Sequence, residues 1–155
     1  MKNKAPGKTL LQVVGIILVV TGILTALVNL INIATLGMMG EGEFGEIMEQ
    51  SLAATGITME VYRMSIYITE AGALLNTVIG IIGIVNCNKI PKAGLCFACG
   101  IIMILWQLAT DVYSAVTSGV NVLGFVGIII GLILPLLYFW GALKNRQAML
   151  DSKDQ

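Results

Sequence analysis

Four long apolar stretches divide the sequence, and each is long enough to cross a lipid bilayer. They cover about residues 10–33, 65–87, 93–113 and 120–143. The first and last contain no charged residue, whereas the second contains only Glu70 and the third only Asp111. A helix needs about 20 mostly apolar residues to span a hydrocarbon core of roughly 30 Å, and backbone groups in lipid must hydrogen-bond within their own segment. The pattern predicts a single all-α, polytopic membrane domain with a bundle of four transmembrane helices.

A polar loop at residues 37–64 separates the first two spans and contains one further periodic segment. Phe44, Ile47, Met48 and Leu52 follow each other at helical spacing, with acidic residues between them. This pattern predicts a short amphipathic outer helix that lies on the membrane surface or covers the end of the bundle. Thr58 then reads as the N-cap of a helix that continues into the second span. The charged tail, residues 144–155, is expected to be disordered.

The charges are distributed unevenly between the two sides of the predicted bundle, although they sum to zero. With four spans both termini share one side, and every Lys and Arg except Arg63 falls there. All acidic residues except Asp151 and Asp154 fall on the other side or at the outer ends of the spans. Because basic residues are retained on the cytoplasmic side, we expect a multi-pass membrane protein with both termini in the cytoplasm.

Composition supports a membrane environment and narrows the possible chemistry. Apolar residues make up 57% of the chain and charged residues 12%, whereas soluble domains average about 45–50% and about 25%. The absence of histidine excludes His-based acid–base catalysis, His-activated nucleophiles and imidazole metal sites. Cys87, Cys96 and Cys99 lie at the cytoplasmic ends of their spans, where we expect packing residues, the alternative being a soft-metal site. We expect no enzymatic activity and no cofactor or metal.

Small residues within the spans indicate where the helices contact each other, because lipid tails are as apolar as leucine and association requires close backbone approach. The second span carries a seam with spacings of four and three residues. Its members are Thr69, Ala73, Asn76, Gly80, Gly83 and Cys87. The first span offers Gly15 and Gly22, and the fourth offers Gly127 and Gly131.

Two features of the fourth span concern its middle and its cytoplasmic end. Pro135 lies near its middle and is expected to kink the helix, because proline removes one backbone hydrogen bond. Tyr138 and Trp140 near its cytoplasmic end fit an aromatic belt at the membrane interface.

Polar side chains within the spans are candidates for a ligand or cation site, since an ionisable residue in a span is a functional-site hypothesis by default. Counting about 1.5 Å per residue puts most of them, together with Asn121, at one level of the outer leaflet. In one interpretation they line an outward-open cavity that binds a cation or cationic solute. In the other, the carboxylates hydrogen-bond across helices and fix the bundle. The candidates are Glu70, Asp111, Gln107, Asn76 and Asn29.

One run of the sequence resembles a known group of proteins. Residues 80–95 read GIIGIVNCNKIPKAGL, and the glycine-rich last span closes in GALKNR. This half of the chain resembles the small four-span membrane proteins of unknown function that are common in Gram-positive bacteria. The resemblance implies a bacterial plasma membrane and no particular activity. The paired loop cysteines of claudins, and the first-span glutamate of small multidrug exporters, are absent.

The sequence favours a non-enzymatic accessory or scaffold component that acts through helix packing and its acidic outer loop. The alternative is a small transporter or channel for a cation or cationic solute, with the outer-leaflet carboxylates as its site. The expected partners are membrane lipids and either another membrane protein or a second copy of the chain, and no nucleic acid.

Overall fold

A computed structural model of the chain describes residues 5–39, 42–119 and 122–152, and these residues form helices without any β-strand. The helices α1, α3, α4 and α5 are long and apolar enough to cross a membrane, which confirms the predicted four-span bundle. A short 3₁₀ turn, Ile90–Lys92, joins α3 to α4. The α-helices are α1 (Lys8–Met39), α2 (Glu43–Ala53), α3 (Met59–Asn86), α4 (Ala93–Ser118) and α5 (Val122–Asp151).

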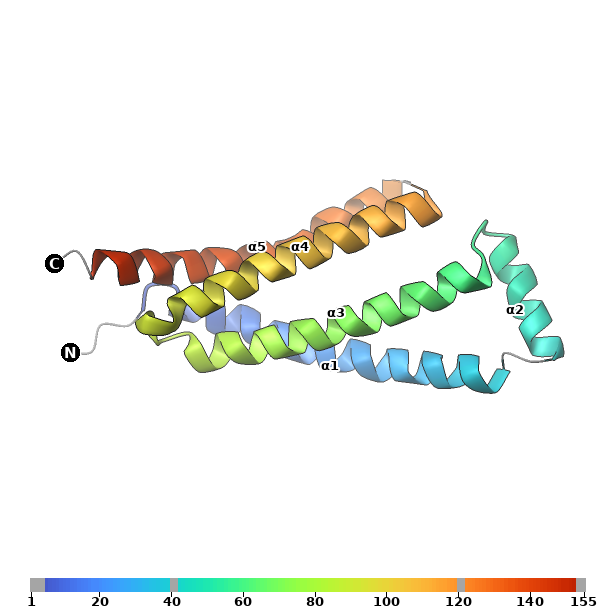
Figure 1. Cartoon of the computed structure of the whole chain (residues 1–155), viewed down its shortest axis with the longest axis horizontal. Coiled ribbons are helices and arrows are strands. Elements are labelled where there is room, and N and C mark those ends of the chain that lie inside the picture. Colours follow the sequence, from blue (N-terminus) through green and yellow to red (C-terminus); the bar gives the residue numbers. More distant parts are fainter. Residues whose placement is uncertain (1–4, 40–41, 120–121, 153–155) are drawn as a thin grey trace.

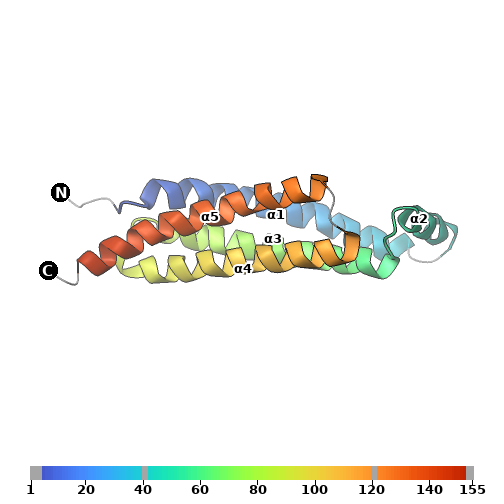
Figure 2. The same ribbon diagram turned by 90° about the horizontal axis from the view of Figure 1, so that it is seen from above.

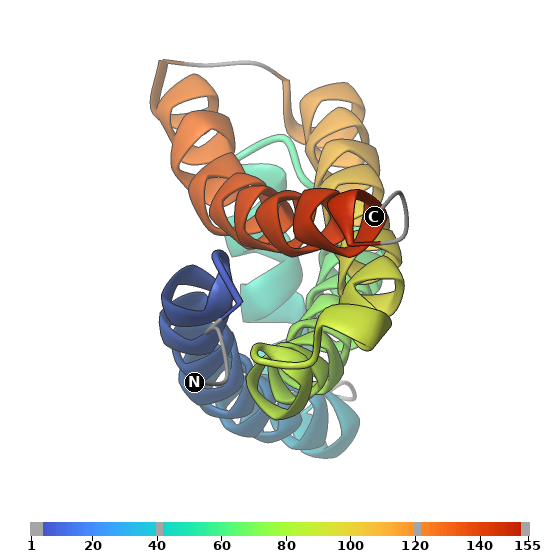
Figure 3. The ribbon, with the colours of Figure 1, turned by 90° about the vertical axis from the view of Figure 1, so that its left-hand side faces the viewer.

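The long helices form two antiparallel pairs, α1 with α3 and α4 with α5 (Figure 1). Helix α1 begins and α5 ends at the same end of the bundle, which we call the terminal end; α2 lies at the opposite, distal end. Figure 2 shows the four long helices running along one common direction. Viewed from the terminal end, the two pairs form two layers (Figure 3).

The two pairs pack closely only in the terminal half and diverge toward the distal end (Figure 1). Buried residues of α4 end at Met103, and those of α5 begin at Pro135. None of the described side chains at 104–117 or 124–134 is buried. The hydrophobic core therefore fills the terminal half. It contains Leu11, Val14, Leu18, Ile79, Cys87, Cys96, Cys99, Met103, Tyr138 and Ala142.

Helices α1 and α3 touch through their backbones at glycines. A Cβ atom added to Gly80 would lie 2.7 Å from the Gly15 carbonyl oxygen, and one added to Gly15 would lie 2.9 Å from the Gly80 carbonyl oxygen. Two turns along α1, a Cβ on Gly22 would lie 2.8 Å from the Ala73 carbonyl oxygen. Such distances exclude any side chain, so these glycines are required for the close approach.

The predicted packing residues of the second span divide between different neighbours. Ala73 and Gly80 contact α1, whereas Gly83 makes room for the Tyr138 ring of α5. Gly131 of α5 lies against the side chain of Gln107 on α4. Gly127 is a correction, because nothing lies within 4 Å of the position its Cβ would take. Gly127 instead borders an unfilled space between the distal halves of α4 and α5.

Tyr138 does not belong to an interfacial belt, as the sequence suggested, but is a fully buried core residue with 0% of its surface exposed. Its hydroxyl group donates a hydrogen bond of 3.2 Å to the Ile79 carbonyl oxygen. A buried tyrosine needs a partner for its hydroxyl group, and Gly83 leaves the space for the ring to reach one. Trp140 is 57% exposed and retains the surface position that was predicted.

The prediction of a disordered tail from residue 144 was also wrong, because α5 continues through residue 144 to Asp151. The reason is Asn145, which is 1% exposed and ties three segments together. Its Oδ1 atom accepts a hydrogen bond of 2.7 Å from the Gly7 backbone N–H, and its Nδ2 atom donates one of 3.0 Å to the Cys87 carbonyl oxygen. These bonds pair backbone groups at the start of α1 and the end of α3 that have no partner within their own helix.

Helix α2 confirms the amphipathic segment predicted in the outer loop, and none of its residues is buried. Its apolar side chains Phe44 and Ile47 are 55% and 60% exposed. Thr58 caps α3 as predicted, since its hydroxyl oxygen accepts a hydrogen bond of 3.3 Å from the Val61 N–H. The positive φ of +76° at Gly56, which favours glycine, shapes the turn between α2 and α3.

Replacing Gly80 with alanine tests the α1–α3 contact. We expect Gly80→Ala to lower the free energy of unfolding by about 1–3 kcal/mol, because the new methyl group forces the two backbones apart. Unfolding by a denaturing detergent measures the change. Gly127→Ala is the matched control and is expected to be neutral or slightly stabilising, since alanine is the better helix former and nothing faces this position. Equal losses in both variants would contradict the assigned contact.

Replacing Asn145 with alanine tests the link between the three segments. We expect Asn145→Ala to lower the free energy of unfolding by about 2–4 kcal/mol, because two buried backbone groups lose their partners. Gln147→Ala, two residues further along at an exposed position, should leave stability nearly unchanged. The same unfolding measurement serves both variants, and a tail that melts independently would show no loss for either.

Candidate functional site

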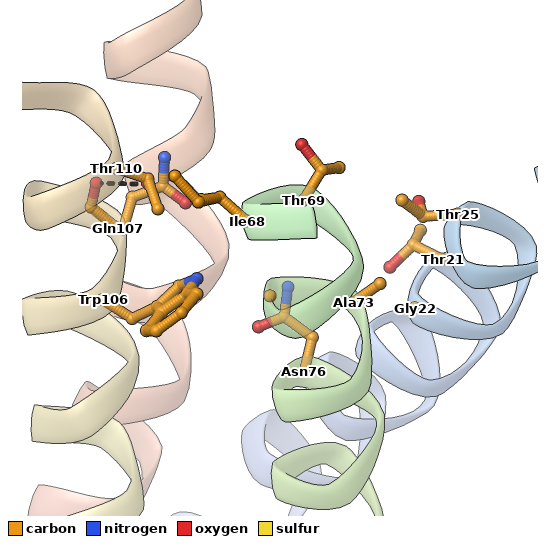
Figure 4. Close-up of a pocket in the computed structure, with 11 residues that line it drawn as sticks. Thr21, Gly22, Thr25, Ile68, Thr69, Ala73, Asn76, Trp106, Gln107 and Thr110 are labelled. Carbon is orange, nitrogen blue, oxygen red and sulfur yellow. Dashed lines mark hydrogen bonds between the residues drawn. The ribbon is translucent and has the colours of Figure 1, made fainter. Parts of the chain in front are cut away.

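A polar cavity lies between α1, α3 and α4, where the two helix pairs begin to separate (Figure 4). Its volume is about 220 Å³. None of the described residues that line it is charged. The lining residues are Thr21, Gly22, Thr25, Ile68, Thr69, Gly72, Ala73, Asn76, Trp106, Gln107 and Thr110. Polar side chains from three otherwise apolar helices therefore meet around one space. We call this space the polar cavity.

The threonines give the polar cavity the character of a hydrogen-bond acceptor. The hydroxyl groups of Thr21, Thr69 and Thr110 each donate a bond of 2.8 Å to a carbonyl oxygen of their own helix. A hydroxyl group has one donor hydrogen and two acceptor lone pairs. Since the hydrogens are used within the helices, the hydroxyl oxygens remain able to accept bonds from a group that enters the cavity.

Trp106 forms the wall of the polar cavity on the α4 side, and Asn76 faces it from α3 (Figure 4). The indole Nε1 atom would lie 2.8 Å from a Cβ atom on Gly72, so the ring fits only because this position is glycine. Gly72 was not among the small residues that the sequence indicated as packing positions. The signal for Gly72 was weak because glycine is common in membrane helices.

Gln107 connects the polar cavity with a second cavity. Its Nε2 atom donates a hydrogen bond of 3.0 Å to Oδ1 of Asp111, one turn along α4. The other carboxylate oxygen of Asp111 is buried and has no hydrogen-bond partner among the residues that the structure describes. Asp111 lines the second cavity, of about 250 Å³, between the distal halves of α4 and α5 together with Ser114 and Gly124.

Asn29 and Glu70 lie outside both of these cavities. Asn29 is 7% exposed, and among the described residues its Nδ2 atom has no hydrogen-bond partner; nor has the buried Oε2 atom of Glu70. Continuing the Gly15–Gly80 and Gly22–Ala73 contacts by one more heptad brings Asn29 opposite Ile66, one helical turn from Glu70. The unpaired donor and the unpaired acceptor therefore occur about one turn apart along α3.

The five candidate side chains do not line one cavity. Asn76 and Gln107 line the polar cavity and Asp111 lines the second cavity, whereas Asn29 and Glu70 line neither. The physical reason is that residues at one level of a bundle can point in different directions around their helix axes. Asn121, expected at the same level, lies outside the described residues.

The polar cavity ends toward the terminal end at the hydrophobic core. Leu18, Ile79 and Met103 of this core are at most 3% exposed and fill the space on the terminal side of the cavity. The three cysteines belong to the same core and are free thiols. Within the described residues, no three His, Cys, Asp or Glu side chains are placed to hold a metal ion together.

A third, acidic hollow of about 190 Å³ lies where α2 meets α3 and the distal end of α1. Glu46 and Glu49 of α2 line it together with Arg63 of α3. All three residues are exposed, so the hollow is an open surface feature. It places the acidic side of α2 next to Arg63, the single basic residue on this side of the bundle.

Comparison with known proteins finds no family model, no curated protein and no solved structure that matches the chain.

Proposed function

We propose that this chain is a non-enzymatic accessory protein that binds a transmembrane helix of another membrane protein along the side of the bundle where the polar cavity opens. The observation that carries the proposal is the separation of the two helix pairs in the distal half, which leaves hydroxyl and amide groups facing an incompletely filled space. The four apolar helices identify an integral membrane protein. The charge distribution along the chain favours an orientation with both termini in the cytoplasm, and the plasma membrane is the location that the resemblance of its second half implies.

Lipid tails are a poor filling for this space. A polar group that faces hydrocarbon without a hydrogen-bond partner costs free energy, and membrane helices instead pair such groups with side chains of a neighbouring helix. The threonine hydroxyl groups and the Asn76 amide are arranged on three helices around one cavity. A fifth helix that passes along this cavity would cover them and complete the bundle.

The chemistry of the cavity specifies the kind of helix. The accepting oxygens of the threonines favour a partner with hydrogen-bond donors, such as Asn, Gln or Lys side chains. The unpaired carboxylate oxygen of Asp111 lies one turn from Gln107 and adds a negative group near the cavity. The exposed glutamates of α2 provide a further acidic surface for the water-exposed part of a partner.

Site-specific photocrosslinking in native membranes tests the proposed helix-binding role. Benzoylphenylalanine in place of Thr69 puts the probe at the rim of the polar cavity, and the same residue in place of Tyr67 puts it on the outer surface of α3. We expect an adduct with an apolar transmembrane peptide at position 69 and none at position 67. An adduct with a second copy of the chain would identify the partner helix as its own.

Two further results decide this experiment. The double change Asn76→Leu and Gln107→Leu removes both cavity amides and should abolish the adduct at position 69. Lipid adducts alone at position 69, or equal protein adducts at positions 67 and 69, would contradict a helix-binding cavity.

A second candidate function is transport of a small cation or cationic solute, and the unpaired buried oxygens of Glu70 and Asp111 favour it. It predicts that one member of a panel of inorganic and lipophilic cations raises the thermal midpoint of the purified protein by about 5–10 °C at a hundredfold excess over its dissociation constant. The double variant Glu70→Gln/Asp111→Asn should lose this shift, whereas Glu46→Gln/Glu49→Gln, with the same charge change on α2, should keep it. No shift with any cation, or a shift in both variants, would count against this function.

A further inference from the structure

The outward surface of α5 near the terminal end carries an apolar groove that the proposed helix-binding site does not use. Its volume is about 580 Å³, and only side chains of α5 line it. Leu136, Trp140 and Leu143 follow helical spacing, so the groove runs along one face of α5. Its lining residues are Ile133, Leu136, Leu137, Phe139, Trp140 and Leu143.

Two basic side chains stand at the terminal end of this groove, each held over an aromatic ring. The Nζ atom of Lys144 lies 5.5 Å from the ring centroid of Trp140, which lines the groove. The Cζ atom of Arg146 lies 4.2 Å from the ring centroid of Phe97, whose ring is 5.0 Å from that of Phe139. These cation–π contacts hold Lys144 at the rim of the groove and Arg146 over the ring that packs beside it.

Neither charge is neutralised within the described part of the chain. Lys144 and Arg146 make the ring contacts just described and no ion pair with a carboxylate. The next acidic residue along α5 is Asp151, which is exposed and more than one helical turn away. An apolar groove thus ends in two uncompensated positive charges.

We propose that this groove binds an anionic phospholipid, with an acyl chain along residues 133–143 and the phosphate group between Lys144 and Arg146. The groove offers the apolar surface that an acyl chain buries, and basic residues at the membrane surface attract anionic headgroups. A zwitterionic lipid fits less well, because its own ammonium group would stand beside two cations. The terminal end is the one that the charge distribution assigns to the cytoplasmic leaflet.

Native mass spectrometry of the detergent-purified chain tests this site with phosphatidylglycerol and phosphatidylcholine of identical acyl chains. We expect phosphatidylglycerol to bind the wild type more tightly than phosphatidylcholine. The variant Lys144→Gln/Arg146→Gln should bind phosphatidylglycerol about thirtyfold more weakly, as expected for the loss of two basic residues at a membrane surface. Its binding of phosphatidylcholine should change little.

The variant Lys89→Gln/Lys92→Gln is the matched control, because it removes two exposed charges from the same end of the bundle but none from the groove. It should keep most of the affinity for phosphatidylglycerol. An equal loss in both double variants would show attraction to the whole basic surface and overturn the site.

A second variant keeps both charges and fills the groove. Leu136→Trp adds bulk at a half-exposed lining position, so it should also weaken phosphatidylglycerol binding. Unchanged binding by Leu136→Trp would overturn the proposed acyl-chain position. Inorganic phosphate should not compete at millimolar concentration, because the acyl chain supplies part of the affinity, and full competition by phosphate alone would overturn a lipid site.

Discussion

The bundle depends on the backbone contact between α1 and α3 at Gly15 and Gly80. Helices in a membrane gain little from burying apolar side chains against each other, so they must approach closely enough for backbone packing. Helix α3 uses a different glycine for each neighbour, with Gly80 facing α1, Gly72 facing Trp106 of α4, and Gly83 facing Tyr138 of α5. Gly72 and Gly83 are eleven residues, or about three turns, apart and share the face of α3 that meets the α4–α5 pair, whereas Gly80 faces α1.

Length and periodicity in the sequence were enough to predict the spans, helix α2 and the Thr58 cap, because these features depend on neighbouring residues in the chain. The neighbours of each small residue were harder to predict. Gly80 and Gly127 look alike in the sequence, yet only Gly80 meets another backbone, because contact depends on how each helix is rotated in the bundle. For the same reason, the five polar candidates do not line one common cavity.

Asn145 shows a second limit of prediction from sequence. Charged residues on both sides of it suggested that the last span had ended, so the tail was expected to be disordered. The spacing of Tyr138, Ala142 and Asn145 nevertheless continues one helical face, and all three are at most 1% exposed. That spacing was the available signal. The backbone groups that Asn145 binds belong to segments more than 50 residues away in sequence, so its partners could not be read from the local pattern.

Pro135 lies on α5 between a part that packs on the core and a part that leaves it. On its terminal side, α5 follows the core through Tyr138 and Asn145, and its exposed face forms the groove beside Lys144. On its distal side, no described residue of α5 is buried, and the α4–α5 pair leaves the α1–α3 pair. Because proline has no N–H, the carbonyl group of Gly131 loses its usual partner, and the Gln107 side chain lies against this residue. Pro135 therefore marks the boundary between the terminal half, which is tied through Asn145 and carries the basic residues, and the distal half, where the polar side chains of the spans are incompletely paired.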